Sequence, residues 1–119
     1  MAEKLTAKQQ AQLAWLETLP PKFERLNRLI EMLAAQHADD VQLRSAQRML
    51  DELKAQASTN GVPALGDTFG YMATLLRRGG GLQLKVRGLR EMLAGARINF
   101  EGAHRAASTP VPESGPTSP

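Results

Sequence analysis

The chain has 119 residues, a formal net charge of +3 and no cysteine, so disulfides, thiolate metal sites and cysteine nucleophiles are excluded. Its length suits one small domain, and its 42% hydrophobic but only 4% aromatic content, with few runs of Val, Ile or Thr, favours helices over sheet. Because no apolar stretch approaches the roughly 20 residues of a membrane span, and the first residues lack the apolar segment of a signal peptide, we expect a cytoplasmic protein.

The N-terminal part of the chain predicts two helices separated by a proline pair. Thr6 and Gln9 have the spacing of a capping box, and an apolar stripe follows until the prolines at 20–21. A short first helix is therefore expected over residues 6–19. Since proline is tolerated in the first turn of a helix, a second helix begins at the second proline and fades near Gln36.

Three more helices are expected in the remainder of the chain. Asp39 or Asp40 can accept the free backbone N–H groups at the start of a third helix, and the Asn-Gly pair at 60–61 supplies its left-handed stop. Pro63 opens a fourth helix, which the three glycines at 79–81 break. A fifth helix, with the most regular apolar spacing of all, follows the glycines.

These helices define the expected architecture. Amphipathic helices joined by loops of a few residues bury their apolar faces by packing antiparallel. We therefore predict an all-α fold over residues 1–107: an up-down antiparallel four-helix bundle with a short extra N-terminal helix, monomeric in solution. Residues 108–119 are rich in Pro and Ser and are expected to form a disordered tail. The predicted core contains Leu50, Leu53, Phe69, Met72, Leu89, Leu93 and Ala96.

A glycine-rich stretch and a basic cluster could each indicate a function, but both have simpler structural interpretations. The stretch RRGGGLQLK, residues 77–85, lacks the Gly-Lys-Ser/Thr ending of a phosphate loop and follows a helix instead of a strand, so it is read as a helix hairpin. Basic residues gather there without interleaved aromatic residues, which favours a solvated surface, and we expect no nucleic-acid or membrane partner. The cluster consists of Arg77, Arg78, Lys85, Arg87 and Arg90.

The remaining candidates for chemistry are also weak. His37 and His104 have no serine or paired carboxylate at a useful spacing, so they are read as surface histidines. We expect no metal and no cofactor. Four methionines lie on or beside the apolar stripes and are read as core filler: Met32, Met49, Met72 and Met92.

A short motif in the third helix points to a signalling family. In the stretch LDELKAQASTNG, an apolar residue and Lys54 are followed by Ala55 and, six positions later, by Gly61. With WLETLPPKFERLNRLIEML, ALGDTFGYMATLL and GLREMLAGA around it, the pattern resembles the histidine phosphotransfer (HPt) domains of two-component signalling. The family has a histidine three positions before the lysine, glycine directly after the lysine, and a second glycine ten positions after the histidine. Here the histidine position falls on Asp51 and the first glycine on Ala55.

The resemblance implies a degenerate member of the family. An imidazole accepts a phosphoryl group as a labile P–N bond, whereas an isolated helical carboxylate does not substitute for it, so we expect no catalytic residue and no enzyme activity. The implied partner is a receiver domain or a histidine kinase, whose phosphorelay this non-phosphorylatable protein would modulate. The implied partner-binding residues are Arg44, Arg48, Asp51, Lys54, Ala55, Gly61 and Val62.

Two alternatives stay open at this point. On the helix surface, Asp51 is expected to pair with Arg48 or Lys54, which is compatible with a binding role but does not require one. The alternative function is a helical adaptor or chaperone-like interaction module unrelated to any phosphorelay.

Overall fold

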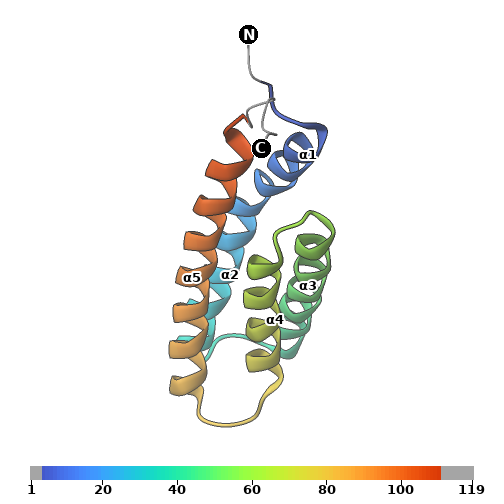
Figure 1. The fold of residues 1–119 in the computed structure, drawn as a ribbon. Helices are drawn as coiled ribbons and strands as arrows, with labels where there is room; N and C mark the ends of the chain where they lie inside the picture. The colour runs from blue at the N-terminus through green and yellow to red at the C-terminus, as the bar shows by residue number, and fades with distance from the viewer. Residues whose placement is uncertain (1–3, 111–119) are drawn as a thin grey trace.

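The computed structural model describes residues 4–110, and every regular element in that range is a helix. The predicted tail therefore lies almost entirely outside the described residues. The elements are α1 (Ala7–Leu16), α2 (Leu19–Ala34), α3 (Asp40–Thr59), α4 (Pro63–Arg77) and α5 (Leu82–Ser108). Figure 1 shows α2, α3, α4 and α5 running alternately up and down, with α1 at one end, which confirms the predicted bundle.

The helix ends follow local chemistry. Thr6 and Gln9 form the predicted capping box: the Gln9 N–H donates to Thr6 Oγ1 at 3.0 Å, and the Thr6 N–H donates to Gln9 Oε1 at 2.9 Å. Asp39, not Asp40, caps α3, because its carboxylate accepts the Gln42 N–H at 2.8 Å. Gly61 has φ +75°, the left-handed conformation that ends α3 and favours glycine.

The boundary between the first two helices differs from the prediction. α1 ends at Leu16, and α2 already begins at Leu19, so both prolines lie inside the first turn of α2. A first turn has no intrahelical partner for its N–H groups, and prolines there cost nothing in hydrogen bonding. The bend falls instead at Glu17 and Thr18, where the Thr18 hydroxyl donates to the Trp15 carbonyl at 2.6 Å.

The core sits between the four long helices, but their packing is uneven. α3 packs most closely on α4, α4 on α5 and α5 on α2, whereas α2 and α3 touch only sparsely. All seven predicted core residues are buried. The bundle is therefore tight on three sides and loosely closed along the α2–α3 side.

α1 ties together helix ends that are distant in sequence. Trp15 Nε1 donates to Gln56 Oε1 of α3 at 2.9 Å. The buried Gln9 amide donates to the carbonyls of Ala106, at 3.2 Å, and Thr109, at 2.7 Å, at the end of α5. The short helix thus supplies a side-chain donor to two carbonyls at and just beyond the C-terminal end of α5, where the helix itself offers few donors.

Two helical glycines allow a direct test of the α3–α4 packing. A Cβ on Gly66 would lie 3.1 Å from the Lys54 carbonyl oxygen and 3.2 Å from Ala57 Cβ, whereas a Cβ on Gly95 would meet nothing within 4 Å. We expect Gly95→Ala to raise the free energy of unfolding by about 0.5–1 kcal/mol through the higher helix propensity of alanine. Gly66→Ala should gain nothing, because α3 and α4 must move apart. Urea unfolding followed by circular dichroism measures both, and equal gains would contradict the close α3–α4 approach.

Candidate functional site

Asp51 lies exposed on α3, at the edge facing α4. Its carboxylate forms an ion pair with the guanidinium of Arg77, from the last turn of α4, and the two side chains are 49% and 50% exposed. The predicted pairing with Arg48 or Lys54 is therefore wrong. An arginine at the end of the neighbouring helix reaches the carboxylate, and spacing along α3 alone cannot indicate such a partner.

Lys54 lies one turn further along the same edge. A Cβ on Gly70 would fall 3.1 Å from Lys54 Cδ and 3.3 Å from its Cε, so the lysine side chain runs across α4 where that helix has no side chain. Gly66, one turn earlier on α4, packs against the Lys54 carbonyl and Ala57, so the two glycines let α4 approach α3 closely along Lys54. Sequence reasoning missed both glycines, although their spacing of four inside a helix was a usable signal of close helix packing.

Three other predicted residues share the outward side of α3. Arg44, Arg48 and Ala55 are exposed, and they lie three or four positions from Asp51 or from one another. Arg48 leans toward the α2 side, where it lines a hollow together with Lys22 and other residues. In the part of the chain that the structure describes, neither Arg44 nor Arg48 has a carboxylate within ion-pair distance.

Gly61 and Val62 are placed apart from this group. They follow the C-terminal end of α3, about 15 Å along the helix axis from Asp51. Gly61 lies against α1, since a Cβ there would fall 2.9 Å from Gln12 Nε2. Val62 is half-buried and lines a hollow together with Ile98 and Ala103 of α5.

Two arginines of the basic cluster form ion pairs with carboxylates on other helices, and one of the two histidines lies near a carboxylate. Arg77 holds Asp51, and Arg90 pairs with Glu31 at 3.0 Å. His37 is exposed as predicted, whereas His104 is half-buried, with its Nε2 3.6 Å from Glu17 Oε2 and its ring 5.7 Å from that of Phe100.

Ser108, His104 and Glu17 superficially have the order of a nucleophile, base and acid. However, the Ser108 hydroxyl donates to the His104 carbonyl oxygen at 2.6 Å, whereas the ring Nδ1 lies 3.5 Å away. The serine proton is therefore held by the helix backbone, as is common for a serine near a helix end, and is not directed at the imidazole.

Within residues 4–110, no three His, Asp or Glu side chains gather as a metal site would require, and no helix is long and apolar enough to cross a membrane. Comparison with known proteins gives no match to any protein-family model, curated protein or solved structure. The protein is thus a helical bundle in which the exposed carboxylate of Asp51 on α3 pairs with Arg77 of α4.

Proposed function

We propose that this protein is an HPt-like docking protein of two-component signalling that binds a receiver domain or a histidine kinase and carries no phosphoryl group itself. By occupying the surface that its partner uses for phosphoryl transfer, the protein modulates the phosphorelay. The proposal rests on the resemblance of the third-helix motif to the HPt signature, in which Asp51 stands at the histidine position.

One structural observation supports this proposal above others. Asp51 is about half exposed on α3, at the edge that faces α4, and the exposed Lys54 lies one turn further along the same edge. A partner can therefore reach the position of Asp51 from solvent. Its carboxylate, however, is engaged by Arg77, and an engaged carboxylate is a poor nucleophile for phosphorus.

Charge supports the choice of partner. Arg44, Arg48 and Lys54 are three exposed cations on α3, against two exposed carboxylates on the same part of the helix, Asp51 and Glu52, of which Asp51 already pairs with Arg77. An acidic pocket, such as the one that surrounds the acceptor of a receiver domain, complements that surface.

A receiver-binding titration tests the proposal. Isothermal calorimetry with candidate receiver and kinase domains should give saturable binding, and Arg48→Glu combined with Lys54→Glu should weaken it by about tenfold or more through like-charge repulsion. Asp51→Ala should tighten binding to a receiver, because it removes a negative charge and releases Arg77.

Arg87→Glu combined with Arg105→Glu is the control, since both residues are exposed on α5 and the pair makes the same change in net charge as the two α3 reversals. Binding that survives the α3 reversals, or that falls equally in the control, would rule out this face as the docking surface.

The second candidate is a helical adaptor unrelated to a phosphorelay. It is favoured by a different observation, the groove along the loosely closed α2–α3 side of the bundle. An adaptor of this kind should ignore receivers and kinases in the same titration.

A further inference from the structure

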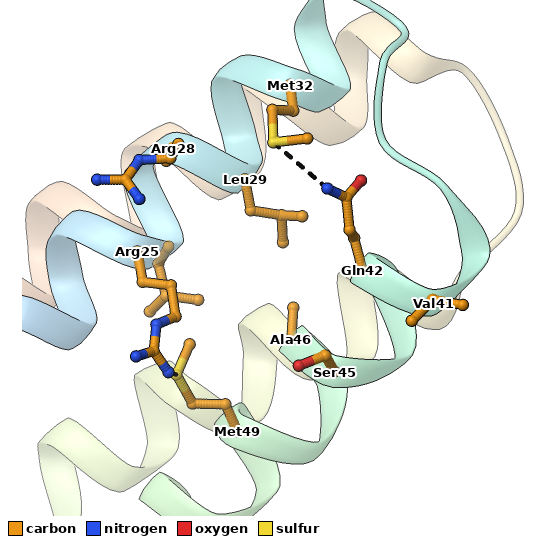
Figure 2. Close-up of a pocket in the computed structure, with 10 residues that line it drawn as sticks. Arg25, Arg28, Leu29, Met32, Val41, Gln42, Ser45, Ala46 and Met49 are labelled. Atoms are coloured by element: carbon orange, nitrogen blue, oxygen red, sulfur yellow. Dashed lines mark hydrogen bonds between the residues drawn. The ribbon is translucent and has the colours of Figure 1, made fainter.

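An apolar groove of about 340 Å³ runs between α2 and α3. Figure 2 shows Leu29 and Met32 on α2 facing Ala46 and Met49 on α3 across this space, with Val41 at one end. Val41 is 72% exposed, an unusual position for a large aliphatic side chain next to other apolar groups.

The groove is bridged only by weak contacts among those described. Arg25 Nη1 donates to Met49 Sδ at 3.9 Å, and Gln42 Nε2 donates to Met32 Sδ, also at 3.9 Å. Thioether sulfur is a weak acceptor, and methionine side chains change shape at little cost. Both bridges can therefore open to admit an apolar side chain from another molecule.

The charged side chains beside the groove are mostly basic, and the two arginines on its α2 side have no carboxylate partner in the part of the chain that the structure describes. Arg25 and Arg28 lie along its α2 side, and neither forms an ion pair within residues 4–110. The two nearest α2 carboxylates turn the other way: Glu24 pairs with Arg97 at 3.1 Å and Glu31 with Arg90 at 3.0 Å, both on α5.

The groove continues into a polar hollow with the same bias. That hollow shares Arg25, Ser45 and Met49 with the groove and adds Lys22 and Arg48, against one carboxylate, Glu52. At the opposite end, Asp39 accepts a backbone N–H as the cap of α3 and Asp40 follows it. The groove and the hollow together form one channel along α2. This channel has an apolar floor where Leu29, Met32 and Met49 line it, and mostly cationic side chains along its edges.

We infer that this channel binds an amphipathic helix with acidic flanks, supplied by a partner protein. The channel follows α2 from Met32 to Lys22, about 15 Å of helix axis, which accommodates about three turns of a bound helix. Apolar side chains at i, i+3, i+4 and i+7 would displace the methionine bridges, and carboxylates beside them would meet Arg25, Arg28 and Arg48. This site lies on the α2 side of α3; it shares Arg48 with the proposed receiver-docking surface but does not involve Asp51, Lys54 or Arg77.

A designed peptide can serve as the probe. It has about 14 residues, with leucines at i, i+3, i+4 and i+7 and glutamates on both flanks, and a fluorescent label for anisotropy. We expect saturable binding, weakened by about tenfold or more in the Arg25→Glu, Arg28→Glu double variant. Arg78→Glu with Arg105→Glu, an equal charge change at exposed positions away from the groove, should leave binding unchanged. A peptide with lysines in place of the glutamates should bind far more weakly.

Methionine methyl NMR locates the bound peptide. Met32 and Met49 line the groove, Met72 is fully buried between other helices, and Met92 lies on α5, so the protein carries its own controls. Peptide should shift the methyl signals of Met32 and Met49 and leave those of Met72 and Met92 in place.

Several results would overturn the inference: no saturable binding, equal binding of the acidic and basic peptides, or shifts confined to Met72 and Met92. Sedimentation could also show a dimer. If that dimer fails to bind the peptide and the Met32 and Met49 methyl signals change with protein concentration, the groove is occupied by a second copy of the chain, and the inference is wrong. Lys54 belongs to the proposed receiver-docking surface but not to the groove, so Lys54→Glu should leave peptide binding unchanged and thereby distinguishes the two sites.

Discussion

Phe69→Ala is expected to lower the free energy of unfolding by about 3–5 kcal/mol, measured by urea denaturation followed by circular dichroism. Phe69 of α4 is fully buried, and its ring centroid lies 6.2 Å from that of Phe23 on α2. Phe23 in turn meets Phe100 of α5 edge to face at 5.6 Å. Removing the Phe69 ring therefore leaves a cavity where three helices meet, and it also removes an aromatic contact.

Tyr71→Ala provides the matched control for this prediction. Tyr71 lies two residues further along α4 but is 64% exposed, so its loss should change stability by less than about 0.5 kcal/mol. Similar losses in the two variants would contradict the assignment of Phe69 to the centre of the core.

The second large effect concerns phosphoryl transfer at position 51. Mixed with an active histidine kinase and labelled ATP, the protein should acquire no acid-labile phosphate, because Asp51 supplies no imidazole. Asp51→His, combined with Ala55→Gly to give a partner room, should acquire it. Asp51 is exposed and its neighbour Lys54 is retained, so the new imidazole would be accessible and would stand where the HPt resemblance places it.

Asp51→Asn is the control for this gain of function and should stay unlabelled. Label on His37 or His104 of the unchanged protein would show that the acceptor lies elsewhere. An Asp51→His, Ala55→Gly variant that folds but accepts no phosphoryl group from any kinase tested would count against the HPt relationship.

The helices themselves were predictable because their ends depend on nearby residues. A threonine and a glutamine three positions apart fixed the start of α1, and Gly61 with Pro63 fixed the turn between α3 and α4. The α1–α2 boundary was missed because proline disrupts a helix interior but is tolerated in a first turn, and the sequence alone does not say which applies.

The surface chemistry was less predictable because it depends on how helices meet. Arg77 reaches Asp51 from another helix, 26 positions along the chain, which no helical spacing rule indicates. Met32 and Met49 were both expected as core filler, and Met49 does pack against the edge of the core, whereas Met32 does not contribute to it. Periodicity identifies an apolar side of a helix but not whether another helix covers it. The sparse contact between α2 and α3 leaves that side open, and the methionines line a groove.

The hydrogen bonds from Gln9 to the end of α5 have a kinetic consequence. α3 and α4 are neighbours in sequence, so their contacts form after closing only a short loop, whereas the Gln9 bonds to Ala106 and Thr109 span 97 and 100 residues. The entropy lost on closing a loop grows with its length, although slowly. We therefore expect the contact between α1 and the end of α5 to form late, after the other helices have assembled.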